Sequence, residues 1–317
     1  MMQDKEQLDI IIPIYNEELC IEELVRRMLE FKNRISYINT SFIFVNDGSK
    51  DRSLELLCFY ANEYEFIKVI SFSRNFGHQI AVTAGLDYSC ADYIAIIDAD
   101  LQDPPELIEE MYKKAKEGYD IVYGKRISRK GESFFKKATA QLFYKFIGKI
   151  CDIDIPPDTG DFRLISKKVI DVLKTMREKH RFLRGMIPWV GFKSTPLLYH
   201  RDERFAGETK YPLRKMIKFA KDAIFSFSDM PLRVANYIGT IIVCLGVLGG
   251  LYMLYIKLFT DAAVSDTTVL VLTMIILGGI QILMIGMIGE YIGRVFEESK
   301  RRPLYIISET KNFNKIN

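Results

Sequence analysis

The chain has 317 residues, a formal net charge of only +3 at pH 7 and 49% apolar residues. The length suits one large or two ordinary domains, and the small net charge argues against nucleic acid or another long polyanion as a partner. Five cysteines without a CxxC pair and three scattered histidines argue against a disulfide framework or a zinc site and suit a reducing compartment. The N-terminal residues lack the apolar core of a signal peptide.

Short apolar runs alternate with amphipathic segments along the first 124 residues. The runs predict strands at 8–14, 41–45, 66–72, 93–97 and 120–124. Helices are predicted between them at 18–31, 49–60, 79–88 and 105–116, with Ser49 as an N-cap. This alternation indicates an α/β fold with a mainly parallel sheet covered on both faces. The polar segment 158–163 is predicted to be a turn.

Acidic residues follow three of the predicted strands. Glu17 follows the first strand, Asp47 the second, and Asp98 and Asp100 the fourth. Ligands of α/β sheets bind at the carboxyl ends of the strands, so we expect these acids to converge on one crevice. Mg²⁺ takes one or two protein carboxylates and keeps its other positions for water and phosphate oxygens. A DxD pattern alone also fits a solvated turn that caps a helix, so both interpretations stay open at this point.

The C-terminal third contains two stretches without charged residues, 234–256 and 267–289. Each reaches the roughly 20 residues that a membrane helix needs, although a pair of buried core helices is an alternative. The connecting loop contains no Lys or Arg, whereas the outer flanks contain Lys218, Lys221, Arg233, Arg294, Lys300, Arg301 and Arg302. The positive-inside rule then places both termini in the cytoplasm. Segment 213–227 predicts a helix in the membrane interface, or else an amphipathic core helix.

Four short motifs lie in order at the predicted strand ends. They are Pro13-x-Tyr15-Asn16-Glu17, Asn46-Asp47-Gly48-Ser49, Ser73-Arg74-Asn75-Phe76-Gly77 and Asp98-Ala99-Asp100-x-Gln102-Asp103. Together they resemble glycosyltransferase family 2, with its Rossmann-like GT-A fold that binds nucleotide-diphospho-sugars. The two apolar stretches add a resemblance to the polyprenyl-phosphate members, relatives of dolichol-phosphate mannose synthase and of bactoprenol glucosyltransferases. Asn46 departs from the pattern, because many members have a second Asp there.

The resemblance implies an inverting transferase that moves a sugar from a nucleotide-sugar to polyprenyl phosphate with Mg²⁺ or Mn²⁺. It implies that the nucleotide-sugar donor is bound by Pro13, Tyr15, Glu17, Asp47, Asp98, Asp100, Gln102, Arg204 and Lys210. Asp98 and Asp100 would also bind the metal. The resemblance assigns the acceptor phosphate to Lys125, Arg126, Arg129 and Ser133, although a basic face that touches anionic lipids is an alternative.

The residues expected to act in the reaction are Asp161, Asp100 and Arg129. Asp161 is a candidate base or orienter of the acceptor, and the alternative is an Asp that stabilises a turn. His78 lies beside the third motif, where a lone His is more often structural, and no role is predicted for it.

Glucose from UDP-glucose is the leading donor by resemblance, and amino-arabinose, N-acetylhexosamine and mannose stay open. The product would be a lipid-linked monosaccharide for surface glycans or lipid modification. A non-catalytic membrane component of an export complex that binds lipid phosphate or nucleotide is the other class considered.

We expect a cytoplasmic GT-A domain at 1–211 with acceptor-side elements at 125–165, and an interface helix at 212–231. Two transmembrane helices at 232–292 and a cytoplasmic tail at 293–317 would follow, in a bacterial inner membrane. Small residues in the spans would permit a homo-oligomer.

Overall fold

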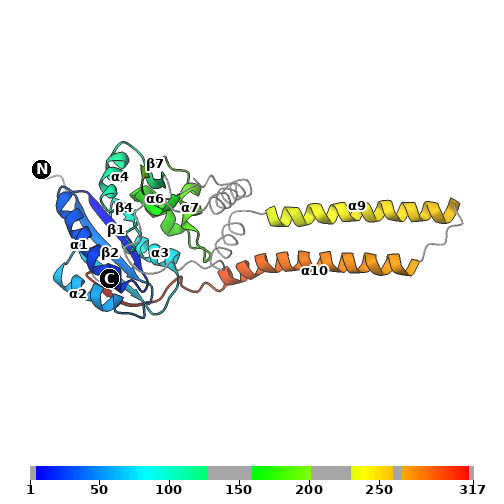
Figure 1. Cartoon of the computed structure of the whole chain (residues 1–317), viewed down its shortest axis with the longest axis horizontal. Helices are drawn as coiled ribbons and strands as arrows, with labels where there is room; N and C mark the ends of the chain where they lie inside the picture. The colour runs from blue at the N-terminus through cyan, green and yellow to red at the C-terminus, as the bar shows by residue number, and fades with distance from the viewer. Residues whose placement is uncertain (1–4, 128–158, 201–229, 260–265, 314–317) are drawn as a thin grey trace. The chain divides into compact units, whose positions relative to one another are not determined.

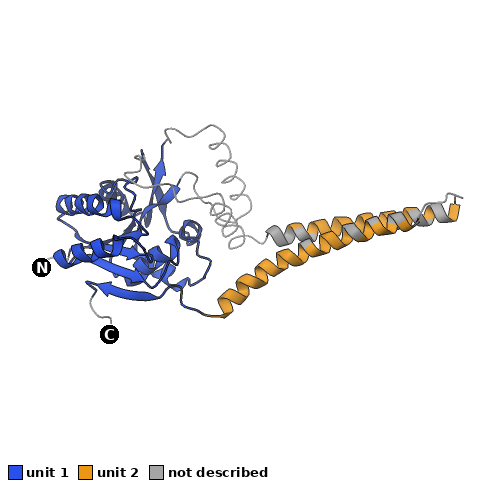
Figure 2. Cartoon of the chain, turned by 60° about the horizontal axis from the view of Figure 1, so that its bottom comes forward, with its two compact units in different colours: residues 1–222, 302–317 blue, residues 223–301 orange. Residues whose placement is uncertain are grey.

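The computed structural model describes residues 5–127, 159–200, 230–259 and 266–313. The chain consists of two compact units (Figure 2). Unit 1 comprises residues 1–222 and 302–317, and unit 2 comprises residues 223–301. Unit 1 contains the sheet and unit 2 contains two long helices.

The described residues of unit 1 form an eight-stranded sheet in the order β7-β5-β6-β4-β1-β2-β3-β8. The strands are β1 (Gln7–Ile14), β2 (Asn39–Asn46), β3 (Ile67–Phe72), β4 (Tyr93–Ile96), β5 (Ile121–Arg126), β6 (Thr159–Ser166), β7 (Ser194–Tyr199) and β8 (Ile307–Lys311). Strands β4, β1, β2 and β3 are mutually parallel. Strand β6 runs antiparallel to both of its neighbours, and β8 runs antiparallel to β3.

Helices pack on both faces of this sheet (Figure 1). They are α1 (Glu18–Arg34), α2 (Ser53–Glu63), α3 (His78–Tyr88), α4 (Leu107–Lys116), α6 (Lys167–Thr175) and α7 (Leu183–Trp189). Side chains alternate between the faces of a strand, so Leu8, Ile10 and Ile12 of β1 join the core cluster that includes α1 and α4. Ile11 faces α3, where a Cβ on Gly85 would lie 2.5 Å from Ile11 Cγ2. The architecture confirms the predicted α/β class.

Two local predictions are wrong. Segment 158–163 was predicted as a turn, but residues 159–166 form β6, in which every residue is buried. The polar side chains of β6 are satisfied inside the fold, as when Arg163 Nη2 donates to the Gly160 carbonyl oxygen at 2.7 Å. Ser49 is not the N-cap of α2, because that helix begins at Ser53. Ser49 Oγ instead accepts a hydrogen bond from Asn16 N at 3.0 Å.

The chain returns to unit 1 after the long helices (Figure 2). Strand β8, within the range expected to be a tail, extends the sheet beside β3. Tyr305 stacks on Phe72 with ring centroids 5.2 Å apart. The side-chain amide of Asn312 donates to the carbonyl oxygens of Ala61, Ile67 and Tyr64 at 2.6, 2.8 and 3.2 Å. Residues 305–312 are therefore built into the edge of the sheet.

Replacing Asn312 with alanine is expected to lower the free energy of unfolding by about 2 kcal/mol, because three carbonyl groups lose their donor. Asn312 also has φ +60°, a conformation that alanine disfavours. Denaturant unfolding of the full chain in detergent measures the change. Asn312→Gly separates the two causes, because glycine tolerates the backbone conformation and lacks the amide. An alanine variant with wild-type stability would contradict the prediction.

Unit 2 contains α9 (Met230–Phe259) and α10 (Asp266–Ser299). The predicted apolar stretches 234–256 and 267–289 lie inside these helices. The helices lie side by side, since a Cβ on Gly239 would meet Met284 Cε at 3.2 Å. Within the described residues, Leu277–Ser299 is long and apolar enough to cross a membrane, and α9 contains a shorter apolar stretch, Tyr237–Gly249. The predicted interface helix at 213–227 lies outside the described residues.

Candidate functional site

Strands β4 and β6 bring two acidic residues together at one edge of the sheet. Their antiparallel register pairs Ile96 with Arg163. Continuing that register by two residues places Asp98, just after β4, opposite Asp161 in β6. This edge is also the carboxyl edge of the parallel strands, where ligands of such sheets bind. The two acids therefore meet where the sheet topology favours a site.

His78 and Arg184 complete this group from two helices. His78 is the first residue of α3, and its Nε2 lies 3.3 Å from Asp161 Oδ2 and 3.6 Å from Asp98 Oδ1. Arg184 on α7 donates two hydrogen bonds to the Asp161 carboxylate, from Nε to Oδ1 at 2.8 Å and from Nη2 to Oδ2 at 2.9 Å. We call His78, Asp98, Asp161 and Arg184 the strand-edge cluster.

The charges of this cluster shift the pKa values of its members. Burial, together with the negative charges of Asp161, Asp103 and Asp100, raises the pKa of Asp98 to about 6 although His78 opposes the shift. Burial would lower the pKa of His78, but Asp161 and Asp98 outweigh burial and raise it to about 9. Burial would raise the pKa of Asp161, but Arg184 and His78 hold it well below its usual range. The ionised form of Asp98 is therefore disfavoured, mainly because its carboxylate is buried.

His78, Asp98 and Asp161 could hold a divalent metal ion, because ligand atoms from all three lie within 4.8 Å of one another. Carboxylate oxygens suit Mg²⁺ and Mn²⁺, and imidazole is a common ligand of transition metals. A bound cation would also favour the ionised form of Asp98. Of the predicted metal pair, Asp98 belongs to this three-residue group and Asp100 lies outside it. Asp100 Oδ1 accepts a hydrogen bond from Gln102 N at 3.2 Å.

Asp47, predicted to bind the nucleoside, is directed at the loop before α3. Its Oδ1 accepts a hydrogen bond from Phe76 N at 2.6 Å, and its Oδ2 accepts from Asn75 Nδ2 at 2.8 Å and from Gly77 N at 2.9 Å. The adjacent Gly48 has φ +65°, and a Cβ there would lie 2.4 Å from the backbone of the same loop. Asp47 therefore shapes the turn that delivers His78 to the cluster.

The other predicted residues lie at several strand ends. Pro13 is buried in β1, and Tyr15 and Glu17 are half-buried in the loop that follows. Gln102 follows Leu101, which has φ +59° and so turns the chain sharply after Asp100. Lys125 and Arg126 end β5. Four predicted residues lie outside the described part of the chain: Arg129, Ser133, Arg204 and Lys210.

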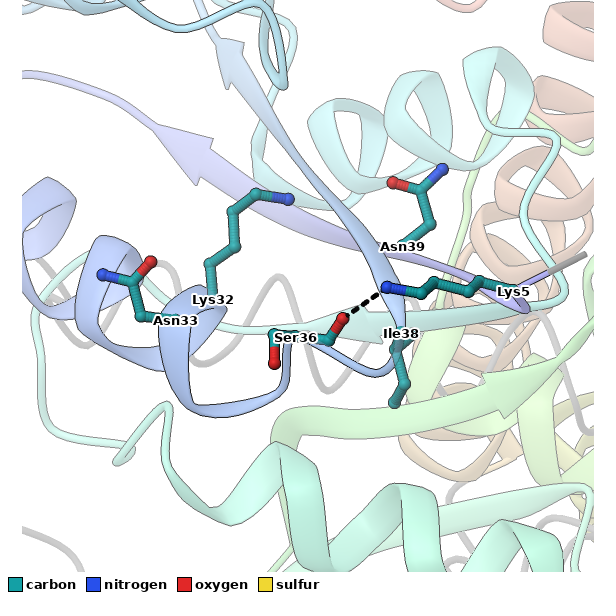
Figure 3. A pocket seen from close by; sticks show the side chains of 6 residues that line it. All are labelled: Lys5, Lys32, Asn33, Ser36, Ile38 and Asn39. Carbon is teal, nitrogen blue, oxygen red and sulfur yellow. Dashed lines mark hydrogen bonds between the residues drawn. The ribbon is translucent and has the colours of Figure 1, made fainter.

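A polar hollow lies elsewhere on unit 1, where β2 begins (Figure 3). Its lining includes Lys5 and Lys32. The Lys5 ammonium donates to the Ser36 carbonyl oxygen at 2.8 Å, and the Lys32 ammonium donates to the Thr40 carbonyl oxygen at 2.5 Å. This hollow is at the edge where the parallel strands start, opposite to the edge that binds ligands in such sheets.

Comparison with known families identifies the chain. Residues 9–173 match the model described as glycosyl transferase family 2, and residues 230–295 match the one described as the GtrB C-terminal hairpin. The chain belongs to glycosyl transferase family 2. The family confirms the resemblance drawn from the four motifs and makes the protein a glycosyltransferase with a GT-A type of sheet.

Several relatives match this glycosyltransferase over almost its whole length. The "Uncharacterized glycosyltransferase YkcC" of Bacillus subtilis (strain 168) is 52% identical, over 96% of this chain and 94% of its own. A "Prophage bactoprenol glucosyl transferase homolog" of Escherichia coli (strain K12) is 38% identical, over 96% and 99%. Glucosyl-3-phosphoglycerate synthase from Mycobacterium tuberculosis, crystallised with Mn²⁺, UDP and phosphoglyceric acid, has a TM-score of 0.46 at 15% identity, over 69% and 76%. That structural likeness is too weak to assign a function.

Reasoning from the sequence missed two members of the strand-edge cluster. His78 directly follows the third motif, after a predicted strand, and this position could have identified it as a residue of the site. Arg184 gave no such signal, because it belongs to α7, which the hydrophobic pattern did not predict.

Proposed function

We propose that this glycosyltransferase moves glucose from UDP-glucose to polyprenyl phosphate. The observation that supports the proposal is that Asp98, Asp161 and Arg126 lie at the same end of neighbouring strands of the sheet. A Cβ on Gly160 would lie only 2.6 Å from Arg126 Nη2, so the guanidinium rests on β6 at the residue that precedes Asp161. Full-length relatives that bear the name bactoprenol glucosyl transferase, at 36–38% identity, support the choice of sugar and lipid.

The donor side consists of the acids and the loops that follow β1, β2 and β4. Asp98 and Asp100 would hold Mg²⁺ or Mn²⁺ with His78 beside them, and that cation would neutralise the diphosphate of the leaving nucleotide. Pro13, Tyr15, Glu17 and Asp47 would hold the nucleoside, and Gln102, Arg204 and Lys210 would contact the diphosphate. Strong positioning of the diphosphate is needed because the leaving group carries most of the developing charge.

The acceptor side supplies the nucleophile, which is a phosphate oxygen of the lipid. This oxygen attacks C1 of glucose, the bond between C1 and the UDP oxygen breaks, and UDP leaves with the electron pair while C1 inverts. The attacking oxygen is already anionic near neutral pH, so positioning by Lys125, Arg126, Arg129 and Ser133 matters more than a base. Asp161 is a poor proton acceptor, because Arg184 holds its pKa low. We therefore assign Asp161 to orienting His78 and the acceptor.

We further propose that α9 and α10 both cross the membrane. Their apolar side chains are largely exposed, as for Leu245 at 62% and Ile282 at 74%, which is unfavourable for a hairpin in water. Strand β8 follows α10 and pairs with β3 of unit 1. A chain that leaves unit 1 before α9 and rejoins its sheet after α10 must cross the membrane an even number of times. Basic residues at the open end of the hairpin, Arg233 near the start of α9 and Arg294 near the end of α10, favour the cytoplasmic side for unit 1.

The experiment is product formation by the purified full chain with Mn²⁺, undecaprenyl phosphate and a panel of nucleotide sugars. We expect lipid-linked glucose from UDP-glucose, and no product from the variant Asp100→Asn. A lipid-linked product from a different nucleotide sugar would correct the sugar and keep the reaction class. Absence of a lipid-linked product with every nucleotide sugar would refute the proposal and favour a non-catalytic component.

A further inference from the structure

Two residues without a predicted role, Tyr199 and Asp103, lie behind the acceptor-side residue Arg126. Tyr199 ends β7, and the parallel register of β5 and β7 pairs it with Arg126. Neighbours across parallel strands direct their side chains to the same face of the sheet. The Tyr199 hydroxyl accepts a hydrogen bond from Arg126 Nε at 3.4 Å. Beyond the strand end, Ile127 N donates to the Tyr199 carbonyl oxygen at 3.0 Å and maintains this pairing.

Two hydrogen bonds link Arg126 to Asp103 through the Tyr199 hydroxyl, and their donors and acceptors can be arranged in only one way. Asp103 is fully buried, and its Oδ1 accepts the hydroxyl hydrogen of Tyr199 at 2.5 Å. A guanidinium can only donate and an ionised carboxylate can only accept. The phenol must therefore donate to Asp103 and accept from Arg126. The rigid ring of Tyr199 therefore connects the Nε side of the Arg126 guanidinium to the buried carboxylate of Asp103.

Two glycines provide the space for this arrangement. A Cβ on Gly124 would lie 2.9 Å from Tyr199 Cε1 and 2.8 Å from Phe162 Cδ1, so the Tyr199 ring packs directly on the backbone of β5. A Cβ on Gly160 would lie 2.6 Å from Arg126 Nη2. The far end of the guanidinium therefore rests on β6 at Gly160, one residue before Asp161.

We propose that Tyr199 and Asp103 are positioning residues that hold the Arg126 guanidinium where it binds the phosphate of the lipid acceptor. The inference rests on the proposed function, because that function gives Arg126 its ligand. With Nε bound to Tyr199, the two terminal nitrogens of Arg126 form the edge that can grip a phosphate in bidentate fashion. Tyr199 and Asp103 act through Arg126, and neither needs to touch a substrate.

Tyr199→Phe tests the proposal, because it keeps the ring that packs at 5.6 Å against Phe162 and removes only the hydroxyl. The KM for undecaprenyl phosphate is expected to rise about five- to tenfold, the effect of one ordinary hydrogen bond. The KM for UDP-glucose is expected to stay within about twofold, since the donor side is unchanged. Binding of undecaprenyl phosphate in detergent without donor should weaken by the same factor as its KM.

The control Tyr37→Phe removes an exposed hydroxyl that bonds to Glu109, and it should change neither KM. Arg126→Gln should weaken lipid binding more than Tyr199→Phe, and the double variant should be no weaker than Arg126→Gln alone. Equal increases in both KM values, or losses that add fully in the double variant, would overturn the inference. Wild-type protein that binds the lipid phosphate but makes no glucose product would contradict the proposed function alone. Wild-type protein that does not bind the lipid phosphate would overturn both.

Discussion

Replacing Asp98 with asparagine is expected to lower turnover by on the order of 1,000-fold, because under the proposed function the site would lose the charge that holds the cation of the diphosphate. Burial and three neighbouring acids already raise the pKa of Asp98 to about 6 in the fold without a cation. A neutral side chain of the same shape should therefore leave the melting temperature unchanged or increase it. Turnover measured against Mn²⁺ concentration, with a parallel melting curve, checks both parts.

The matched control for this variant is Asp171→Asn, which neutralises an exposed carboxylate on α6. It should keep wild-type turnover and the wild-type requirement for Mn²⁺. If Asp98→Asn turned over within about tenfold of the wild type, the rate would be too high for a group that meets the diphosphate, and the donor site would have to lie elsewhere. A large fall in melting temperature would instead indicate a structural role.

Replacing Arg184 with methionine is expected to destabilise the protein by about 3 kcal/mol, because Asp161 would stay buried without its bidentate partner. Asp161 is only 7% exposed, so water cannot replace the two hydrogen bonds from Arg184. Methionine retains much of the arginine's apolar bulk, so the effect reports the lost charge more than a cavity. Denaturant unfolding of the full chain measures the change.

The double variant Arg184→Met with Asp161→Asn tests the cause of that loss. Asparagine removes the buried charge, so the double variant should recover a large part of the lost stability. If the two single changes added without coupling, the ion pair between α7 and β6 would not be what holds the cluster together. His78 would keep a carboxylate neighbour in the double variant, namely Asp98 at 3.6 Å.

The parallel core of the fold could be predicted from the sequence because its signals are local. Strands β1 to β5 are short apolar runs separated by amphipathic helices, and the acids that follow them mark the carboxyl edge of the sheet. Strand β6 could not be predicted in this way. Its buried Asp161 and Arg163 resemble turn residues, and only pairing with strands that are distant in the sequence satisfies them. Strand β8 depends in the same way on a partner more than 200 residues earlier.

The candidate site likewise contains residues that local sequence predicts and residues that depend on distant strand pairing. Asp98 and Asp100 follow a recognisable strand, so their place at the sheet edge was predictable. Asp161 entered only through the resemblance to a family, and its position opposite Asp98 needs the antiparallel register of β6. The links from Asp103 through Tyr199 to Arg126 join three distant segments, and no spacing in the sequence reveals them.

We propose that Asp98, two residues after β4, holds the cation that carries the diphosphate of the donor. The most direct measurement is a crystal structure of the full chain with Mn²⁺ and UDP, with the metal located by its anomalous scattering. We expect one Mn²⁺ peak in direct contact with the Asp98 carboxylate and with a phosphate oxygen of UDP, on the same sheet edge as Arg126. A Mn²⁺ peak away from Asp98, or UDP bound at another edge of the sheet, would contradict it.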